Sequence, residues 1–396
     1  MPPFTATIRQ LPRPFWVLIG ATFVNRFGVF VWPFLTLYMT RNGNTPAQAG
    51  WAVSAYSVGA FGAAWIGGWL ADRMGRNVTM ALSALGSAAC MMALSQSSDW
   101  RILSALSFLT GLVAEAGSPA SSALVQDMVP VELHVTAFAV WRFAINLGWS
   151  LGPMVAGMLA EHSFFWLFAV DAMTSAFFGI IAWIWLPRGR KTEAHRAGWR
   201  VAWQSIRVNK PFLALFAACL CCSWSFRQTS TTFMLHLKES GHSMSWSGII
   251  LAVNGIMICI MEMPLTAVSH RIASRTMIAL GFLLMGAAYL VLIGPSPLWM
   301  FVLCVVVFTL GEMFAFSRQP AYAAGLAPED MRGRYSGFIS FAWAIGGIVG
   351  SAGGLQLYGV SPAAVWIVSA VLGAIAALLI LMPLDSDQMK DEKNAH

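Results

Sequence analysis

The sequence predicts an all-α membrane protein whose twelve transmembrane helices form two pseudo-symmetric bundles of six. The first observation is composition: 58% of the 396 residues are hydrophobic and 10% are charged, whereas a soluble domain usually carries about 25% charged residues. The second is a series of long apolar runs separated by short polar segments. The third is a single long polar connector with six apolar runs on each side.

Each apolar run is long enough to cross a bilayer, because about 20 apolar residues span the roughly 30 Å of hydrocarbon. We predict spans at 15–38, 47–71, 77–97, 100–125, 134–160, 163–186, 211–236, 244–268, 275–293, 297–324, 331–358 and 361–383. No cluster of Cys, His and carboxylate residues has the spacing of a metal site. There is also no Gly-rich nucleotide loop and no catalytic triad, so we expect no metal, no bound cofactor and no enzymatic activity.

Basic residues are distributed unevenly between the predicted loops. Of the 24 Lys and Arg residues, we place 17 on the side of the N-terminus, three on the opposite side and four within spans. Positive loops resist translocation, so both termini are predicted to be cytoplasmic, in a bacterial inner membrane. The net charge of +7 is then explained by topology and anionic lipid, and we expect no nucleic-acid partner.

The polar connector 187–210 divides the chain. Trp199 and Trp203 lie four residues apart in its second half, which predicts an amphipathic helix on the inner leaflet. We therefore predict an N-terminal bundle, the connector, a C-terminal bundle and a cytoplasmic tail, at 1–186, 187–210, 211–383 and 384–396. Glycine spacing repeats between the halves at about 200 residues, which indicates parallel repeats facing a central cavity.

A charged motif interrupts the apolar sequence between the second and third spans. The stretch GGWLADRMGRN resembles the loop signature of the major facilitator superfamily, G-x-L-A-D-R-x-G-R-[RK], and departs from it at Asn77. The matching residues are Gly68, Leu70, Ala71, Asp72, Arg73, Gly75 and Arg76. The resemblance extends over the whole chain, in the twelve spans and the central connector.

The resemblance implies a role for this loop. Asp72 is expected to be held by Arg73 or Arg76 and by the acid at the end of the fourth span, Asp127, as a latch between transport states. Gly68 is expected to let the second span approach a neighbouring helix closely. Gly75 is expected to permit a tight turn.

A glycine motif lies in the fifth span. The residues Gly148, Gly152, Pro153 and Gly157 in NLGWSLGPMVAG form a smooth face for close packing, with a proline that bends the helix. The motif is similar to that of the drug:proton antiporters of the family, which favours that branch. The fourth span departs from the branch, because Ser107 stands where an arginine normally precedes Gly111.

Ionisable residues inside spans are costly and are therefore functional candidates. The resemblance implies that the first, fourth, seventh and tenth helices line the cavity, and the ionisable residues on them are Arg26, Glu115, Arg227, Glu312 and Arg318. We expect Glu312 or Glu115 to carry the proton. We assign structural roles to the other intramembrane polar residues, Asn25, Arg142, Asp171 and Glu262.

These observations favour a monomeric, proton-coupled exporter of lipophilic or cationic small molecules that works by alternating access. The alternative is a proton-coupled transporter of a defined metabolite: a sugar, amino acid, peptide or organic anion. Arg26 and Arg227 favour that alternative, because arginine suits an anionic group. A third interpretation, a non-transporting receptor, is disfavoured by the intact loop motif.

Overall fold

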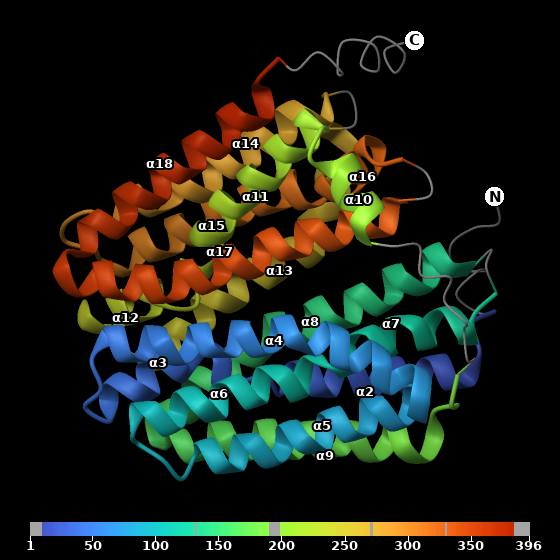
Figure 1. Ribbon diagram of the computed structural model, residues 1–396. Coiled ribbons are helices and arrows are strands. Elements are labelled where there is room, and N and C mark those ends of the chain that lie inside the picture. Colours follow the sequence, from blue (N-terminus) through green and yellow to red (C-terminus); the bar gives the residue numbers. More distant parts are fainter. Residues whose placement is uncertain (1–9, 131–132, 190–198, 270–271, 329–330, 384–396) are drawn as a thin grey trace. The chain divides into compact units, whose positions relative to one another are not determined.

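The computed structural model describes residues 10–130, 133–189, 199–269, 272–328 and 331–383, and all regular secondary structure in these ranges is helical (Figure 1). The predicted tail 384–396 and the middle of the connector lie outside the described residues. The chain forms two compact units. The first consists of Met1–Glu193 with Leu237–Cys259, and the second of Ala194–His236 with Ile260–His396.

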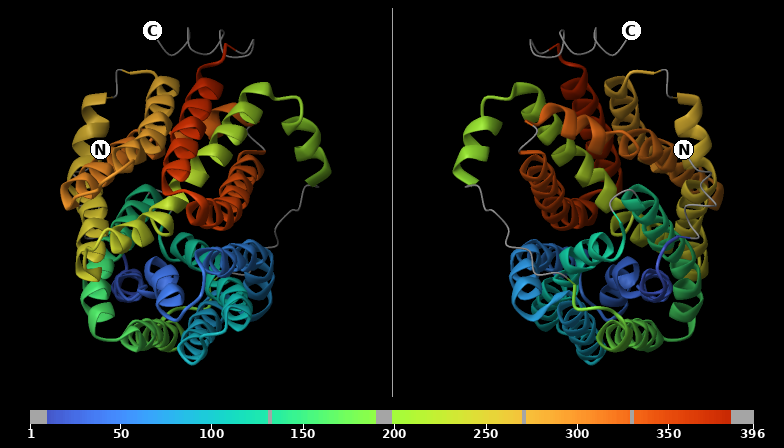
Figure 2. Two further views of the ribbon diagram at one scale, coloured as in Figure 1. Left: turned by 90° about the vertical axis from the view of Figure 1, so that its left-hand side faces the viewer. Right: turned by 90° about the vertical axis from the view of Figure 1, so that its right-hand side faces the viewer.

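The helices of the first unit, seen close to end-on as the blue to green ribbons of Figure 2, form a bundle. They are α2 (Arg13–Phe27), α3 (Val31–Arg41), α4 (Pro46–Met74), α5 (Arg76–Leu94), α6 (Trp100–Glu115), α7 (Gly117–Met128), α8 (His134–His162) and α9 (Phe164–Trp185). Two helices cross from one unit to the other, α12 (Thr232–Glu239) and α13 (Met244–Val268). The second unit contains α10 (Trp199–Ile206), α11 (Lys210–Gln228), α14 (Ser274–Ala287), the 3₁₀ helix η3 (Ala288–Leu292), α15 (Leu298–Phe316), α16 (Gln319–Leu326), α17 (Arg332–Val360) and α18 (Pro362–Leu381).

Local sequence explains where several helices begin, because the first amide groups of a helix need partners outside its own turns. Thr45 and Gln48 form a capping box at the start of α4. Ser163 and Ser361 cap α9 and α18 with their hydroxyl groups. Each serine directly follows a helix of 29 residues, so one polar residue ends one span and begins the next.

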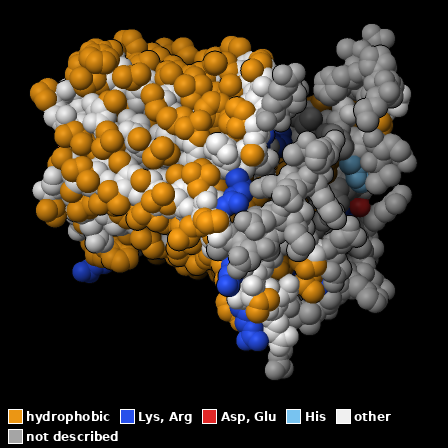
Figure 3. All heavy atoms as spheres, turned by 90° about the horizontal axis from the view of Figure 1, so that it is seen from above, with side chains coloured by type: hydrophobic (Ala, Val, Ile, Leu, Met, Phe, Trp, Pro, Cys, Tyr) orange, Lys and Arg blue, Asp and Glu red, His pale blue; other side chains and the backbone are white. Residues whose placement is uncertain are grey.

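The helices confirm the predicted fold class. Within the described residues, ten helical stretches are long and apolar enough to cross a membrane. The other two predicted spans coincide with α4 and with α11 followed by α12. Figure 3 shows a face largely covered by hydrophobic side chains, with most of the visible Lys and Arg side chains toward one end. The sequence did not reveal that several spans are broken, as α2 is from α3, α6 from α7 and α15 from α16.

The two halves repeat in their helix positions and in their packing. Five helices begin 198 residues after an earlier one, as Ser274 of α14 follows Arg76 of α5; the pairs are α4 and α13, α5 and α14, α6 and α15, α8 and α17, and α9 and α18. In the first unit α2 packs on α8 and α5 on α9. In the second unit α11 packs on α17 and α14 on α18.

The second half of the connector forms α10, which packs on α17. The Trp203 and Phe338 rings stack with centroids 5.7 Å apart, and the hydroxyl groups of Ser205 and Tyr335 lie 2.9 Å apart. Trp203 is nevertheless 54% exposed. The amphipathic helix is therefore tied to the start of the eleventh span along one side.

Candidate functional site

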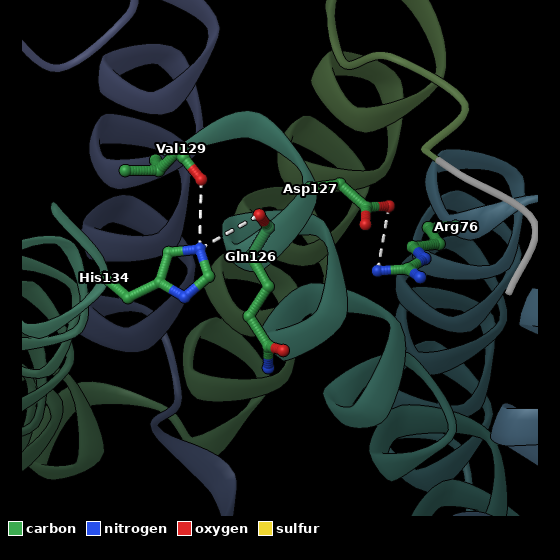
Figure 4. Close-up of polar contacts among 5 residues, drawn as sticks. All are labelled: Arg76, Gln126, Asp127, Val129 and His134. Atoms are coloured by element: carbon green, nitrogen blue, oxygen red, sulfur yellow. Dashed lines mark hydrogen bonds and ion pairs between the residues drawn. The ribbon is translucent and has the colours of Figure 1, made fainter. Parts of the chain in front are cut away.

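The loop between the second and third spans contains an ion pair. Arg76 Nη1 at the start of α5 lies 2.9 Å from Asp127 Oδ2 near the end of α7, and the two side chains are 12% and 14% exposed (Figure 4). The two groups point toward each other, and their low exposure reduces screening by water. This pair joins the loop motif to the end of the fourth span.

The first residues of the connector pack against this ion pair. The Arg76 N–H donates to the carbonyl oxygen of Arg188 over 2.9 Å. A Cβ at Gly189 would lie 2.8 Å from Asp127 Oδ2, and Gly189 has a φ of +75°. Only a residue without a side chain fits this approach, so the backbone of the connector closes over the ion pair.

Two other residues of the loop motif take places that the sequence did not predict. The Arg73 guanidinium lies over the Trp69 ring, 5.3 Å from its centroid. The expectation for Gly68 was wrong: no described atom lies within 4 Å of a Cβ at this position, whereas a Cβ at Gly67 would lie 2.1 Å from Ala116 O. Helix rotation turns the neighbouring glycine toward α6, and apolar periodicity does not fix that rotation.

The structure describes the backbone of Gly75 but not the side chain of Asp72. Gly75 has a φ of +94° between α4 and α5, a conformation that favours glycine. The Asp72 side chain lies outside the described residues. Its predicted contacts with Arg73, Arg76 and Asp127 stay a prediction.

His134 supports the same region and was missed in the sequence. Its Nε2 lies 3.2 Å from Gln126 O and 3.0 Å from Val129 O (Figure 4). A carbonyl can only accept, so Nε2 carries the proton. The ring at the start of α8 thereby satisfies carbonyl groups left over at the end of α7, next to Asp127.

The first span is broken beside the predicted residue Arg26. Helix α2 ends at Phe27, and α3 begins at Val31. Asp171 of α9 is 2% exposed, and its Oδ2 accepts from Phe30 N over 3.2 Å and from Val31 N over 3.4 Å. The buried carboxylate therefore caps α3 from another helix.

Further contacts join the first span to the sixth around this break. Asn25 Nδ2 donates to Ser175 Oγ over 3.2 Å. A Cβ at Gly28 would lie 1.9 Å from Thr174 Oγ1, so the backbone there rests directly on α9. Arg26 is half-buried in the last turn of α2. The sequence had assigned Asp171 and Asn25 to structural roles but had not placed them at the break in the first span.

The broken first span packs against the glycine motif of the fifth span. A Cβ at Gly148 would lie 2.7 Å from Arg26 Cβ, and one at Gly152 would lie 2.4 Å from Phe27 O. Helix α2 therefore lies directly on the glycine face of α8. A Cβ at Gly157 would lie 2.5 Å from Met244 O at the start of α13. Pro153 is buried inside α8.

Glu115 ends α6 at the break in the fourth span. Tyr56 Oη of α4 donates to Glu115 Oε1 over 2.9 Å, and the Tyr56 ring lies 3.7 Å from the Trp32 ring between centroids. Ser83 of α5 spans the break, with Oγ 2.7 Å from Val113 O and accepting from Gly117 N over 3.0 Å. The acid is thus half-buried beside aromatic rings, at a fixed interruption of the helix.

Arg227 lies at the end of α11, against the glycine stripe of α17. A Cβ at Gly347 would lie 2.8 Å from Arg227 Nε. Beside it, the fully buried Gln228 donates from Nε2 to Gly350 O over 3.0 Å and accepts at Oε1 from Thr232 Oγ1 over 2.8 Å. Gln228 was missed because an amide near the end of an apolar run gives no distinctive pattern.

Glu312 of α15 is half-buried among residues of neighbouring helices. Its charge acts on Cys222 of α11 and on Tyr289 of η3. Tyr289 Oη in turn donates to Ser225 O over 2.7 Å. The acid therefore lies near Cys222 and Tyr289 within the second unit.

Arg318 lies in the break between α15 and α16, and its donors point to a loop. Nη1 donates to Ile272 O over 3.0 Å, and Nη2 donates to the carbonyl and hydroxyl oxygens of Ser269. The guanidinium ties the tenth span to the connection between α13 and α14. Arg142 of α8 is exposed and Glu262 of α13 is half-buried.

These charged and polar side chains inside the spans are suited to bind charged species and to let them move. Within the described residues, no group of three His, Cys, Asp or Glu side chains could hold a metal ion. The polar groups instead gather at helix breaks, where main-chain groups need partners. In membrane proteins, interrupted helices of this kind are associated with sites for substrates and ions.

Comparisons with known proteins agree with this architecture. The family profile described as Major Facilitator Superfamily matches residues 18–351 and 248–396. The chain is 26% identical over 367 residues to the Na(+), Li(+), K(+)/H(+) antiporter of Planococcus maritimus, with 84% of this chain and 86% of that protein covered. It is 30% identical over 258 residues to the multidrug resistance protein MdtG of Klebsiella pneumoniae (strain 342), with 60% of each covered.

A solved structure shows the same fold. The nucleoside transporter NupG is similar with a TM-score of 0.80 at 14% identity, and the match covers 93% of this chain and 99% of that chain. At this identity the likeness concerns the fold alone.

Proposed function

We propose a substrate class and a coupling ion from one premise: the chain belongs to the Major Facilitator Superfamily, and it is an integral membrane protein and a secondary transporter, not an enzyme. Its function, as we infer it, is proton-coupled export of lipophilic or cationic small molecules by alternating access. An antiporter and a multidrug resistance protein among the similar proteins support this choice.

The observation that carries the proposal is the position of the two acids predicted to line the pathway, Glu115 and Glu312. Both are half-buried, and Glu115 lies at the break in the fourth span. The donors of Arg318 are directed at main-chain and hydroxyl oxygens of a loop. Carboxylates along a pathway attract cations.

A proton coupling follows from the same two acids. Protonation removes the negative charge that attracts a cation, so a proton and a cationic substrate compete for one carboxyl group. Release of one favours binding of the other, which is the requirement for exchange. We propose Glu312 as the proton carrier and Glu115 as the second candidate.

A defined anionic metabolite is the second candidate substrate. Arg227 favours it, since Gly347 leaves the guanidinium room that a side chain would fill and arginine binds carboxylates in a bidentate manner. This candidate requires Arg227 to outweigh two acids, which is why we place it second.

We also propose a bacterial cytoplasmic membrane as the location, with both termini in the cytoplasm and a monomer as the working unit. The distribution of basic residues supports the orientation. A fluorescent protein fused to the C-terminus is expected to fold and fluoresce. A periplasmic phosphatase fused there is expected to stay inactive, and the opposite pattern would reverse the proposed orientation.

The test is transport in inside-out vesicles, using a fluorescent lipophilic cation and an imposed pH gradient, acidic inside. Wild type is expected to accumulate the dye, and Glu312→Gln is expected to reduce the initial rate at least tenfold. Glu239→Gln, an exposed glutamate of α12, is the matched control and should transport normally.

Two other outcomes redirect the proposal. Transport that survives Glu312→Gln and is lost in Glu115→Gln would move the proton to Glu115. No dye movement under any gradient would overturn the cation proposal, and uptake of radiolabelled organic anions would then be measured in wild type and Arg227→Gln.

A further inference from the structure

Glu115 lies where a carboxylate is costly. It is half-buried at the end of α6, inside the fourth span, and a charge there is unfavourable unless a hydrogen-bond donor or a cation compensates it. Tyr56 Oη supplies one donor, to Oε1 over 2.9 Å. Among the described residues, no Lys, Arg or His side chain forms an ion pair with Glu115. The carboxylate therefore has the capacity to bind a cation that comes from outside the protein.

The backbone beside Glu115 is held by two neighbouring helices. From α5, Ser83 Oγ accepts from Gly117 N over 3.0 Å, across the break between α6 and α7. From α4, Gly67 lies so close that a Cβ there would clash with Ala116 O. The acid at the edge of the break is thus held in position before any ligand arrives.

Two aromatic rings lie beside this carboxyl group. One is the ring of Tyr56, whose hydroxyl contacts Glu115, and the other is the Trp32 ring of α3, 3.7 Å from the Tyr56 ring between centroids. Both aromatic side chains are half-buried. Trp32 directly follows the break in the first span, where Asp171 accepts from Val31 N. Three helices of the first unit therefore bring one carboxyl group and two rings together.

A carboxylate beside aromatic rings is a combination that binds organic cations. The face of an aromatic ring attracts positive charge through its quadrupole, and quaternary ammonium groups are recognised in this way. The carboxylate adds direct charge attraction. An alkali-metal ion fits less well, because hard cations are usually surrounded by several oxygen ligands and this cluster offers one carboxyl group and one hydroxyl group.

We propose that Trp32, Tyr56 and Glu115 form the subsite that binds the positively charged group of the substrate, and that the substrate is an aromatic or quaternary organic cation. The inference rests on the proposed function and deepens it by naming the substrate class. Protonation of Glu115 removes the charge attraction, so a proton competes with the substrate at this subsite. The two rings set the preference for organic over alkali cations.

Binding of radiolabelled tetraphenylphosphonium to the purified protein in detergent tests the subsite without transport. Glu115→Gln is expected to raise the Kd about tenfold or more, because it removes the charge while its side-chain oxygen can still accept from Tyr56. Trp32→Leu is expected to raise the Kd about tenfold, whereas Trp32→Phe keeps a ring and should stay within about threefold of wild type. Trp16→Leu, at an exposed tryptophan of the same span, is the matched control and should leave the Kd unchanged.

Tyr56 separates the role of the ring from that of the hydroxyl group. Tyr56→Phe keeps the ring and should change the Kd by less than about threefold, whereas Tyr56→Leu should raise it about tenfold. Radiolabelled sodium ion is the probe for the alkali-cation alternative. Sodium binding that is lost in Glu115→Gln and kept in Trp32→Leu would indicate an alkali-metal site and would overturn the proposal.

The binding assay also separates this inference from the proposed function. Folding of every variant is checked by size-exclusion chromatography, and Tyr56→Leu replaces Trp32→Leu if the latter does not fold. If the expected Kd pattern holds while vesicles move no dye under any gradient, only the proposed function fails. If wild type does not bind the probe, or if neither Glu115→Gln nor the loss of a ring changes the Kd, the inference fails even when dye transport is normal.

Discussion

The opening span of each unit is interrupted, but the two interruptions are held by different chemistry. In the first unit, between Phe27 and Val31, a carboxylate from another helix accepts from the amides of the break. In the second, between Gln228 and Thr232, the neutral side chain of Gln228 joins the break to Gly350 of α17. Each interrupted span packs on a glycine face, which lies on the fifth span in the first unit and on the eleventh span in the second.

The sixth spans show the same contrast. Asp171 lies seven residues after the start of α9, and Ser369 lies seven residues after the start of α18. Ser369 is fully buried, and its hydroxyl accepts from Trp224 Nε1 over 3.2 Å. Each repeat therefore places a buried polar side chain of its sixth span against its first span, a carboxyl group in one repeat and a hydroxyl group in the other. The difference teaches that the same helix contact can be made by different polar groups.

Substitutions in the glycine faces of the fifth and eleventh spans are expected to have the largest effect on folding. Gly148→Leu would place a Cβ 2.7 Å from Arg26 Cβ and 2.8 Å from Phe27 N, and overpacking of this kind typically costs about 1–3 kcal/mol or more. We expect the yield of monodisperse protein to fall at least tenfold by fluorescence-detected size-exclusion chromatography. Gly346→Leu, its counterpart in the second unit, should fail to a similar degree.

Gly20 supplies the control for that pair. It lies in α2, with no described atom within 4 Å of a Cβ, so Gly20→Leu should be tolerated. A well-folded Gly148→Leu beside a failing Gly346→Leu would break the equivalence of the two glycine faces.

The neutral interruption is expected to affect stability without affecting selectivity. Gln228→Leu leaves Gly350 O and the Thr232 hydroxyl without their amide partner in a buried place, which costs about 1–3 kcal/mol. The apparent melting temperature in detergent should fall, while the folded fraction keeps the wild-type KM for the dye. A changed KM in the folded fraction would show that the interruption after Gln228 also affects substrate binding.

Ser369→Ala is expected to have the smallest effect. It removes one buried hydrogen bond, from Trp224 Nε1, and a bond of this kind contributes about 1 kcal/mol. The melting temperature should fall slightly and transport should be unchanged. Ser340→Ala, at an exposed site on α17, gives the baseline. A loss of transport in Ser369→Ala would mean that the second unit relies on this position as much as the first.

Hydropathy predicted the ten spans that the described helices meet in length and composition, and also the helices that coincide with the other two, because bilayer thickness sets the length of a span. The glycine spacing predicted the repeat. The breaks at Gly28 and Ala116 could not be predicted, since apolar residues continue through them. Nor could the partners of Arg318 and Asp171, because helix rotation decides which side chains meet. The same limitation made Gly68, rather than Gly67, the expected point of close approach.

The bond from Arg76 N to Arg188 O has a mechanical consequence. It fixes the chain at Arg188, and Gly189 packs against the ion pair directly after it. From Gly189 to the start of α10 at Trp199 the chain can reach at most about 36 Å, whereas measured from the end of α9 at Trp185 it would reach about 50 Å. Anchoring thus shortens the tether that joins one unit to the next. The distance that α10 can reach is then limited by covalent length, and breaking the bond from Arg76 N to Arg188 O would lengthen that reach.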